Sequence, residues 1–125
     1  KFIKIKRGIG NFYNNSFKNL TEVQLPLSRT TYAENIYWVY GLVVKNKKHK
    51  APYYIKKLRK LGVECRPFFC PMHLQPVFKS MKIFKKEKFP VSENLFNYGF
   101  YIPCGIGIKK KELTYVANMI KKIFK

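Results

Sequence analysis

The sequence predicts an α+β protein in which helices pack on a small, mostly antiparallel sheet of three strands. Three observations predict this class: apolar residues at helical spacing near both ends, an unbroken apolar run at 36–44, and glycines and prolines that separate the segments. With 125 residues, the chain has the length of one domain, which we place at 1–125.

The first third of the chain is expected to be helical and then irregular. Apolar residues recur every three or four positions from 2 to 20, which predicts an amphipathic helix. Gly8 and Gly10 weaken this helix by about 1 kcal/mol each relative to alanine. The segment 23–27 contains a proline and is too short to be a central strand, and residues 29–35 are expected to form a connecting loop.

The middle of the chain predicts a strand, a helix and a second strand. Residues 36–44 (IYWVYGLVV) are β-branched and aromatic without polar alternation, which is typical of a strand covered on both faces. Pro52 then opens a helix over 51–61, and Gly62 supplies its C-terminal cap. The second strand, 63–69, follows directly.

The last third predicts two helices and a third strand. Residues 79–88 are basic and are expected to be irregular or briefly helical. Pro90 and Gly99 bracket a short helix. A strand at 100–102 follows, and a closing helix at 109–124 places apolar residues inward and lysines outward.

The segment 63–78 (VECRPFFCPMHLQPVF) is the most informative about function. Its prolines at 67, 71 and 76 fix φ and remove backbone donors, so we expect no helix to run through it and a strand to continue as a stiff loop. The loop carries the side chains most capable of chemistry, which are Arg66, Cys70, His73 and Gln75. Aromatic neighbours such as Phe68 would hold it against a surface, as in a binding site or half of one.

Two interpretations of His73 remain open at this point. A single histidine is most often hydrogen-bonded and structural. Beside Arg66 and Gln75 on a loop stiffened by prolines, a ligand-facing role is an equally good interpretation.

The cysteines predict packing in preference to metal binding or catalysis. Cys65, Cys70, His73 and Cys104 carry zinc's preferred donor atoms, but their spacing matches no common zinc motif. Buried free cysteines behave as small apolar residues, so we expect no metal site. A cysteine nucleophile beside a histidine would also need a third orienting group, for which the chain offers no aspartate.

The formal net charge of +20, from 26 basic and 6 acidic residues, raises an alternative function. Such an excess is typical of proteins that bind nucleic acid, so a basic nucleic-acid-binding module is the alternative. Arginine is scarce, however, and the lysines are spread over all predicted helices. We expect non-specific polyanion binding as a side effect.

The lack of a long apolar run and the number of cysteines predict where in the cell the protein works. No apolar run is long enough to cross a bilayer, so no membrane partner is expected. Three cysteines cannot form a closed set of disulfides, which favours a reducing compartment and predicts a cytoplasmic protein.

Four segments resemble motifs of the DegT/DnrJ/EryC1/StrS family of sugar aminotransferases, in the same order along the chain. Residues 66–78 (RPFFCPMHLQPVF) are similar to its R-P-F-F-x-P-(L/M)-H-x-Q-P-x-F segment, and residues 35–41 (NIYWVYG) to its N-x-Y-W-x-Y-G strand. Residues 89–95 (FPVSENL) and 99–105 (GFYIPCG) resemble its P-V-(A/S)-E-N-L and G-L-Y-(I/L)-P-S-G segments. The strand at 35–41 is most similar to the GDP-perosamine synthase branch.

The resemblance implies the C-terminal small domain of a fold-type I aminotransferase that uses pyridoxal phosphate to aminate a nucleotide-linked 4-keto sugar for sugar or polysaccharide biosynthesis. The opening helix, 1–20, looks like the stretch that links the two domains of such enzymes. The implied partners are the large domain of the same enzyme, a second subunit and the nucleotide sugar. By motif position, the residues expected near cofactor and substrate are His73, Arg66, Phe68 and Gln75.

Chemistry limits what the chain can do alone. Pyridoxal phosphate needs a lysine for its Schiff base and usually an acid at its pyridine nitrogen. The chain has no aspartate, and no lysine lies in a segment resembling the family's Schiff-base motif. We therefore predict no catalytic residue, no cofactor binding and no activity without the large domain. Because the chain begins with Lys1, we expect a piece of a longer enzyme.

The apolar content adds a third interpretation. Aromatic residues make up 17% of the chain, more than three strands and four helices readily bury. This surplus predicts a partner domain or subunit, and it would also suit a purely structural dimerisation domain.

Overall fold

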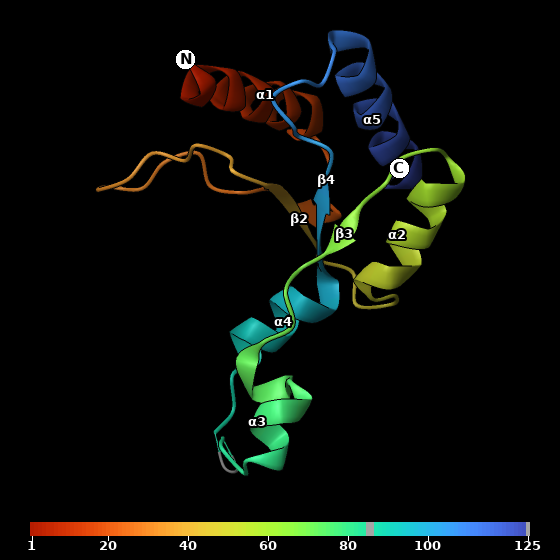
Figure 1. Ribbon diagram of the computed structural model, residues 1–125. Coiled ribbons are helices and arrows are strands. Elements are labelled where there is room, and N and C mark those ends of the chain that lie inside the picture. The colour runs from red at the N-terminus through yellow and green to blue at the C-terminus, as the bar shows by residue number, and fades with distance from the viewer. Residues whose placement is uncertain (85–86, 125) are drawn as a thin grey trace.

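A four-stranded antiparallel sheet organises the protein (Figure 1). The structure is a computed structural model that describes residues 1–84 and 87–124. The strands are β1 (Val23–Gln24), β2 (Tyr40–Val44), β3 (Arg66–Pro67) and β4 (Gly99–Ile102), in the order β1-β2-β4-β3. The predicted α+β class is confirmed. The prediction of three strands is wrong, because β1 adds a two-residue edge by pairing Val23 with Val44.

The predicted long helices are present. The helical segments of the described residues are α1 (Phe2–Phe17), α2 (Ala51–Lys60), η1 (Met72–Leu74, a 3₁₀ turn), α3 (Pro76–Ser80), α4 (Pro90–Tyr98) and α5 (Lys110–Ile123). The largest difference in length is in α1, which was predicted to reach residue 20. None of these helices is long and apolar enough to cross a membrane.

α2 begins and ends as the sequence predicts. Pro52 lies in its first turn, where a missing N–H costs no hydrogen bond. Gly62 follows with a φ of 71°, the left-handed conformation that favours glycine. The N–H of Val63 then donates to the carbonyl of Leu58 at 3.0 Å, so the chain turns back toward the sheet without a linker.

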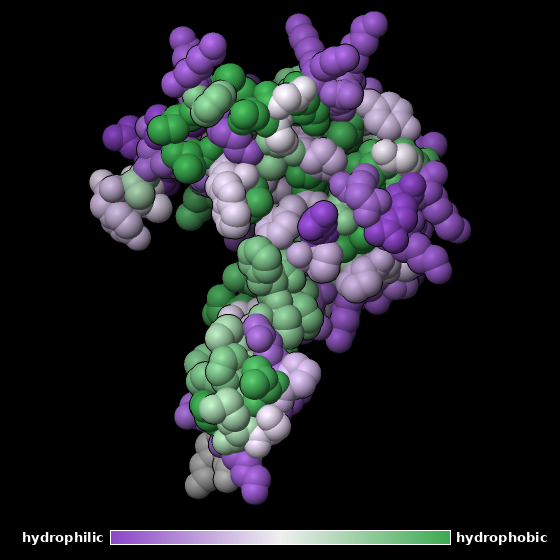
Figure 2. Space-filling view, in the orientation of Figure 1, coloured by the Kyte–Doolittle hydropathy of each residue, from purple (hydrophilic) through white to green (hydrophobic). Residues whose placement is uncertain are grey.

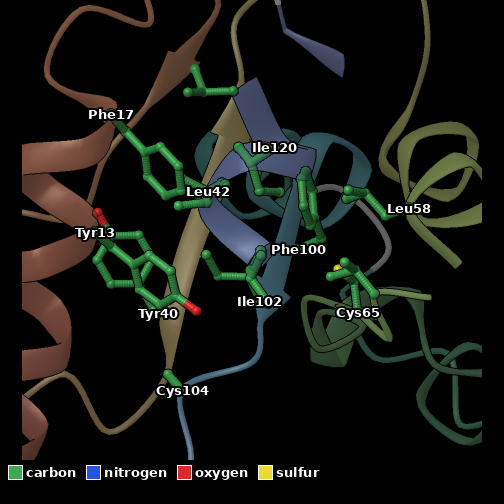
Figure 3. Packing of buried hydrophobic residues seen from close by; sticks show 14 of the residues in the cluster. Tyr13, Phe17, Tyr40, Leu42, Leu58, Cys65, Phe100, Ile102, Cys104 and Ile120 are labelled. Carbon is green, nitrogen blue, oxygen red and sulfur yellow. The ribbon is translucent and has the colours of Figure 1, made fainter. Parts of the chain in front are cut away.

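The core lies between one face of the sheet and α1, α2 and α5 (Figure 3). Alternate residues of the two central strands point into it, namely Tyr40, Leu42 and Val44 of β2 with Phe100 and Ile102 of β4. The helices contribute Tyr13, Phe17, Leu58 and Ile120, each fully buried. The inward lysine-free faces of α1, α2 and α5 are those that helical periodicity predicts.

Two core tyrosines keep their hydroxyls hydrogen-bonded. The hydroxyl of Tyr13 donates to the carbonyl of Pro103 at 2.6 Å, and that of Tyr40 donates to Oδ1 of Asn14 at 2.6 Å. Burial raises the pKa of both phenols well above the ordinary value, because the charged phenolate would be poorly solvated there.

The strand predicted at 36–44 begins only at Tyr40. Tyr37 has a φ of 51°, which interrupts the extended backbone. Its buried ring lies against Gly10 of α1, where a Cβ would overlap the ring, and its hydroxyl accepts a hydrogen bond from Nδ2 of Asn14 at 2.8 Å. Packing against α1 therefore overrides the local preference for strand.

The segment 63–78 also differs from the prediction. The strand expected at 63–69 is reduced to β3, and η1 and α3 occupy part of the expected loop. α3 can begin at Pro76 because proline is tolerated in the first turn of a helix. Of the basic stretch predicted at 79–88, residues 85 and 86 lie outside the described part of the chain.

Two segments project from the body (Figure 1). We call them the 25–39 loop, which joins β1 to β2, and the 68–98 arm, which contains η1, α3 and α4. Figure 2 shows that the arm presents a largely hydrophobic surface. The exposed apolar side chains of the arm include Phe69, Met72, Val77, Met81 and Val91, and those of the loop include Leu27, Ile36 and Trp38.

Candidate functional site

Phe68 fixes the root of the arm, at the point where β3 ends. Its N–H donates to the carbonyl of Gly99 at 3.1 Å. Its ring stacks on Tyr101 of β4, with ring centroids 4.9 Å apart and planes inclined by 28°. Because Tyr101 alternates with the inward Phe100 and Ile102, this stack lies on the face of the sheet opposite the core.

His73 joins η1 to α4. Its Nε2 lies 3.1 Å from Oε1 of Glu93, and its ring centroid lies 4.7 Å from that of Phe89. The side chain of His73 is only 10% exposed, whereas that of Glu93 is 42% exposed. A histidine oriented by a carboxylate can fix the shape of the arm, and through its other nitrogen it can contact a bound molecule.

Gln75 closes the tip of the loop on itself. Its Nε2 donates to the carbonyl of Cys70 at 3.3 Å and lies 3.5 Å from Sδ of Met72. Both partners precede it by five residues or fewer, so the contact shapes the turn before α3 begins. Cys70 itself is exposed at this turn.

Arg66 lies at the base of the arm, on the edge strand β3. Its backbone pairs with Tyr101, and its side chain is exposed. Among the described residues its guanidinium makes no hydrogen bond or ion pair. Glu64 nearby is instead bound by Arg59, whose hydrogen bond lowers the pKa of that carboxyl, with a weaker contribution from the charge of Arg66.

Of the four predicted site residues, the structure thus brings Phe68, His73 and Gln75 onto one arm, with Arg66 at its base. A hollow of about 280 Å³ adjoins Phe68 on the face of the sheet opposite the core, which we call the open face. It is lined mainly by apolar groups, including Leu25, Leu27, Val39, Gly41, Phe68 and Leu95. Of the four, only Phe68 lines this hollow. A larger hollow of about 660 Å³, between Val63 and Tyr115, is lined by none of them.

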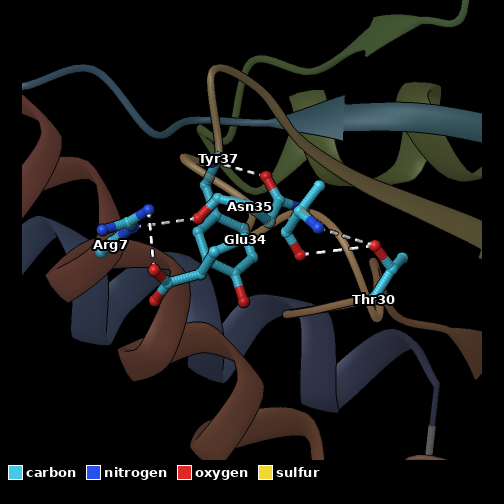
Figure 4. A network of polar contacts seen from close by, with 6 residues as sticks. Arg7, Thr30, Glu34, Asn35 and Tyr37 are labelled. Carbon is cyan, nitrogen blue, oxygen red and sulfur yellow. Dashed lines mark hydrogen bonds and ion pairs between the residues drawn. The ribbon is translucent and has the colours of Figure 1, made fainter.

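The 25–39 loop on the other side of the hollow is held by polar contacts (Figure 4). Nη2 of Arg7 in α1 lies 2.9 Å from Oε2 of Glu34. Nε of the same arginine donates to the carbonyl of Asn35 at 3.3 Å. Oδ1 of Asn35 accepts the N–H of Tyr37 at 2.6 Å, and its Nδ2 donates to the carbonyl of Leu27 at 2.9 Å. Asn35 therefore fixes both ends of the loop, although the sequence marked it only as part of a motif.

Two of the three cysteines pack in the core, as predicted, and the third does not. Cys65 and Cys104 are buried in the core and Cys70 is exposed, and the three are free thiols. Burial raises the pKa of Cys65 to about 12, so its thiol is protonated at neutral pH and a poor metal ligand. No group of histidine, cysteine and acidic residues suited to a metal ion occurs among the described residues.

Fold and arm together define an α+β domain with a small antiparallel sheet and a projecting, largely hydrophobic arm. The family is clear from comparison. The chain belongs to the DegT/DnrJ/EryC1/StrS aminotransferase family, whose sequence model matches residues 1–121. The resemblance carried by the four motifs is thereby confirmed.

Individual relatives agree with this assignment. The chain is 24% identical over 123 residues to GDP-perosamine synthase of Escherichia coli O157:H7, a match covering 98% of this chain and 32% of that protein. It is 26% identical over 126 residues to GDP-perosamine synthase of Vibrio cholerae, covering 99% and 33%. It superposes on PseC of Helicobacter pylori, an aminotransferase involved in the biosynthesis of pseudoaminic acid, with a TM-score of 0.83, 14% identity, and coverage of 98% and 32%. The chain spans about a third of the length of these relatives.

Aminotransferases of this family depend on pyridoxal phosphate, so the residues of the chain can be tested for a fit to that cofactor. Among the described residues, neither a lysine nor any other charged side chain is buried. The carboxylate nearest to the arm's histidine, Glu93, is already bound by it. The described residues therefore do not form a cofactor site by themselves.

The site also contains residues that sequence reasoning missed. Glu93 was noted only as part of a motif, yet it is the partner of His73, 20 positions away. Gly41 and Gly99 were noted as strand and turn residues, yet both contact the ring of Phe68. A glycine inside an otherwise bulky strand was the available signal, because it often marks close approach of another group.

Proposed function

We propose that this chain supplies one wall of the active site of a pyridoxal-phosphate-dependent aminotransferase whose substrate is a nucleotide-linked 4-keto sugar. The observation that carries the proposal is that the family match extends over residues 1–121 and includes the whole arm. GDP-perosamine synthases are among the relatives, which supports a sugar nucleotide as substrate class.

The arm supplies positioned groups and leaves the bond-making chemistry to other parts of the enzyme. Arg66 offers an exposed cation at the base of the arm, suited to an anionic part of a nucleotide sugar. Phe68 and the adjoining apolar hollow offer a surface for a ring. His73 and Gln75 hold the loop between them in shape and would lie next to the sugar and the cofactor.

The reactive groups would come from the large domain of the same enzyme, and a second subunit would complete the pocket. The exposed apolar side chains of the arm and of the 25–39 loop support such contacts, because apolar surface of this extent is usually covered. Val91 and Phe69, exposed by 73% and 71%, are the most prominent on the arm. On this proposal the chain alone has no aminotransferase activity and works in the cytoplasm.

The nucleic-acid-binding alternative has no support from the family or from the structural relatives. The positive charge is instead spread over exposed positions of several helices, as in α2 and α5. Non-specific attraction of polyanions is what such a surface would produce.

The test begins with the reading frame upstream of Lys1, which we expect to encode a large domain with the Schiff-base lysine. The protein expressed from the whole frame should show the absorbance band of bound pyridoxal phosphate and aminate a nucleotide-linked 4-keto sugar. The chain 1–125 mixed with the cofactor should show neither. Turnover by 1–125 alone would contradict the proposal.

The placement of the arm is tested by variants of that whole protein. We expect His73→Ala to lower turnover while the fold stays intact, and Ser92→Ala, at an exposed position of α4, to leave turnover unchanged. Full activity of His73→Ala would remove His73 from the site.

A further inference from the structure

Two glycines on neighbouring strands form a slot on the open face of the sheet. Gly41 of β2 pairs with Tyr101 of β4, and Gly99 of β4 pairs with Val43 of β2. In an antiparallel pair these four residues share one face, so Gly41 and Gly99 are diagonal neighbours there. Where other residues would project side chains, the surface between the two glycines is bare backbone.

The ring of Phe68 fills this slot. A Cβ at Gly41 would lie 2.6 Å from Cζ of Phe68. A Cβ at Gly99 would overlap the other edge of the same ring and would lie 2.5 Å from the carbonyl oxygen of Leu95. Neither glycine has a positive φ, so the backbone conformation does not require glycine at either position. What glycine provides there is space for the ring.

The same device fixes the second projection. The ring of Tyr37, at the end of the 25–39 loop, lies over Gly10 of α1, where a Cβ would also overlap it. Gly10, likewise, has no positive φ. The 25–39 loop and the 68–98 arm are therefore each anchored by an aromatic ring that packs directly on glycine backbone.

We propose that Gly41 and Gly99 are positioning residues, which seat Phe68 and thereby fix the direction in which the loop 68–75 leaves the sheet. The backbone bond from Phe68 to Gly99 and the stack on Tyr101 hold the ring from two further sides. With the root fixed in this way and His73 bound to Glu93, the loop is held at both ends. Its effect on substrate binding rests on the proposed function.

The first test uses the chain 1–125 and hydrogen exchange of its backbone amides. Gly41→Ala should force the ring of Phe68 out of the slot and speed exchange in the loop 68–75 by about tenfold or more, as overpacking does. Amides of α5 should be unaffected. Gly105→Ala is the matched control, because a Cβ there meets nothing within 4 Å.

Removal of the ring provides the rescue. In a Phe68→Ala background, the amides of the loop should already exchange fast. Adding Gly41→Ala should not change the exchange rate further, because the new Cβ at position 41 has no ring to clash with. If Gly41→Ala alone does not fold, the double variant should fold. Faster exchange spread evenly over α5, unchanged exchange in the loop, or a double variant that still fails to fold would each overturn the proposal.

A second measurement separates this inference from the proposed function. In the whole enzyme, Gly41→Ala should raise the KM for the sugar nucleotide several-fold more than it lowers kcat, because the loop binds and does not react. A normal KM together with the expected change in exchange would contradict the proposed function and leave the positioning role standing.

Discussion

Nε2 of His73 lies 3.1 Å from Oε1 of Glu93, and this contact closes the arm between η1 and α4. The two residues come from different motifs of the sequence and are 20 positions apart. His73 therefore has a structural role in shaping the arm. On the proposed function it would also lie beside the substrate.

A double-mutant cycle measures this contact. We expect His73→Ala and Glu93→Ala to be coupled by roughly 0.5–1 kcal/mol in urea unfolding, since Glu93 is partly open to solvent and the pair is screened. His73→Ala combined with Ser92→Ala should show no coupling. A coupling near zero for His73 with Glu93 would show that the contact does not stabilise the arm.

Gly8 and Gly10 should respond oppositely to alanine, although both lie in α1. A Cβ at Gly8 meets nothing within 4 Å, so Gly8→Ala should stabilise the protein by about 0.5–1 kcal/mol through helix propensity. A Cβ at Gly10 overlaps the ring of Tyr37, so Gly10→Ala should destabilise it by about 1 kcal/mol or more despite the same gain. Thermal and urea unfolding of the two variants would measure this, and equal effects would contradict the seating of Tyr37.

Stability should fall above about pH 10. The pKa of Tyr13 and that of Tyr40 are raised by burial, so above pH 10 the unfolded chain has lost these protons while the folded chain retains them. Below the pKa of the unfolded chain, both phenols contribute their full stabilisation. As the pH rises from that pKa toward the folded pKa, each phenol lowers the free energy of unfolding by about 1.4 kcal/mol per pH unit. Urea unfolding at pH 9, 10.5 and 11.5 would measure the slope.

Tyr13→Phe should reduce this slope. It also removes the hydrogen bond to Pro103, which should lower stability at pH 8 by roughly 1 kcal/mol. A slope that is the same in the variant and the parent protein would contradict the assignment to Tyr13.

Alkylation should distinguish the exposed Cys70 from the buried Cys65. Cys70 is exposed, so iodoacetamide at pH 8 should modify it first. Cys65, buried and with its pKa raised to about 12, should react only when the protein unfolds. Peptide mass spectrometry with and without urea would show the order, and equally fast labelling of Cys65 and Cys70 would contradict the buried placement of Cys65.

Several elements follow from the sequence for local reasons. The ends of α2 are set by Pro52 and Gly62, whose backbone preferences act without any neighbour. α5 follows from its apolar spacing and one cap, in which Oε2 of Glu112 accepts the N–H of Lys109 at 2.6 Å. Two of the four family motifs, at 66–78 and 89–95, lie mainly on the arm.

Other elements were beyond local reasoning. β1 is two residues long and exists because β2 offers it an edge. The strand predicted at 36–44 loses its first four residues because Tyr37 packs on Gly10. Where such a strand begins and ends depends on residues that are distant in sequence, and a window of neighbouring residues does not contain them.

The sequence by itself determined the α+β class, the long helices, and the membership of the family through motifs at fixed spacing. Only the tertiary structure decided that His73 is bound to Glu93 and that Gly41 and Gly99 seat Phe68. The physical reason is range. Helix propensity, caps and prolines act within a few residues, whereas the contact of His73 with Glu93 and the seating of the Phe68 ring depend on where separate strands and helices meet.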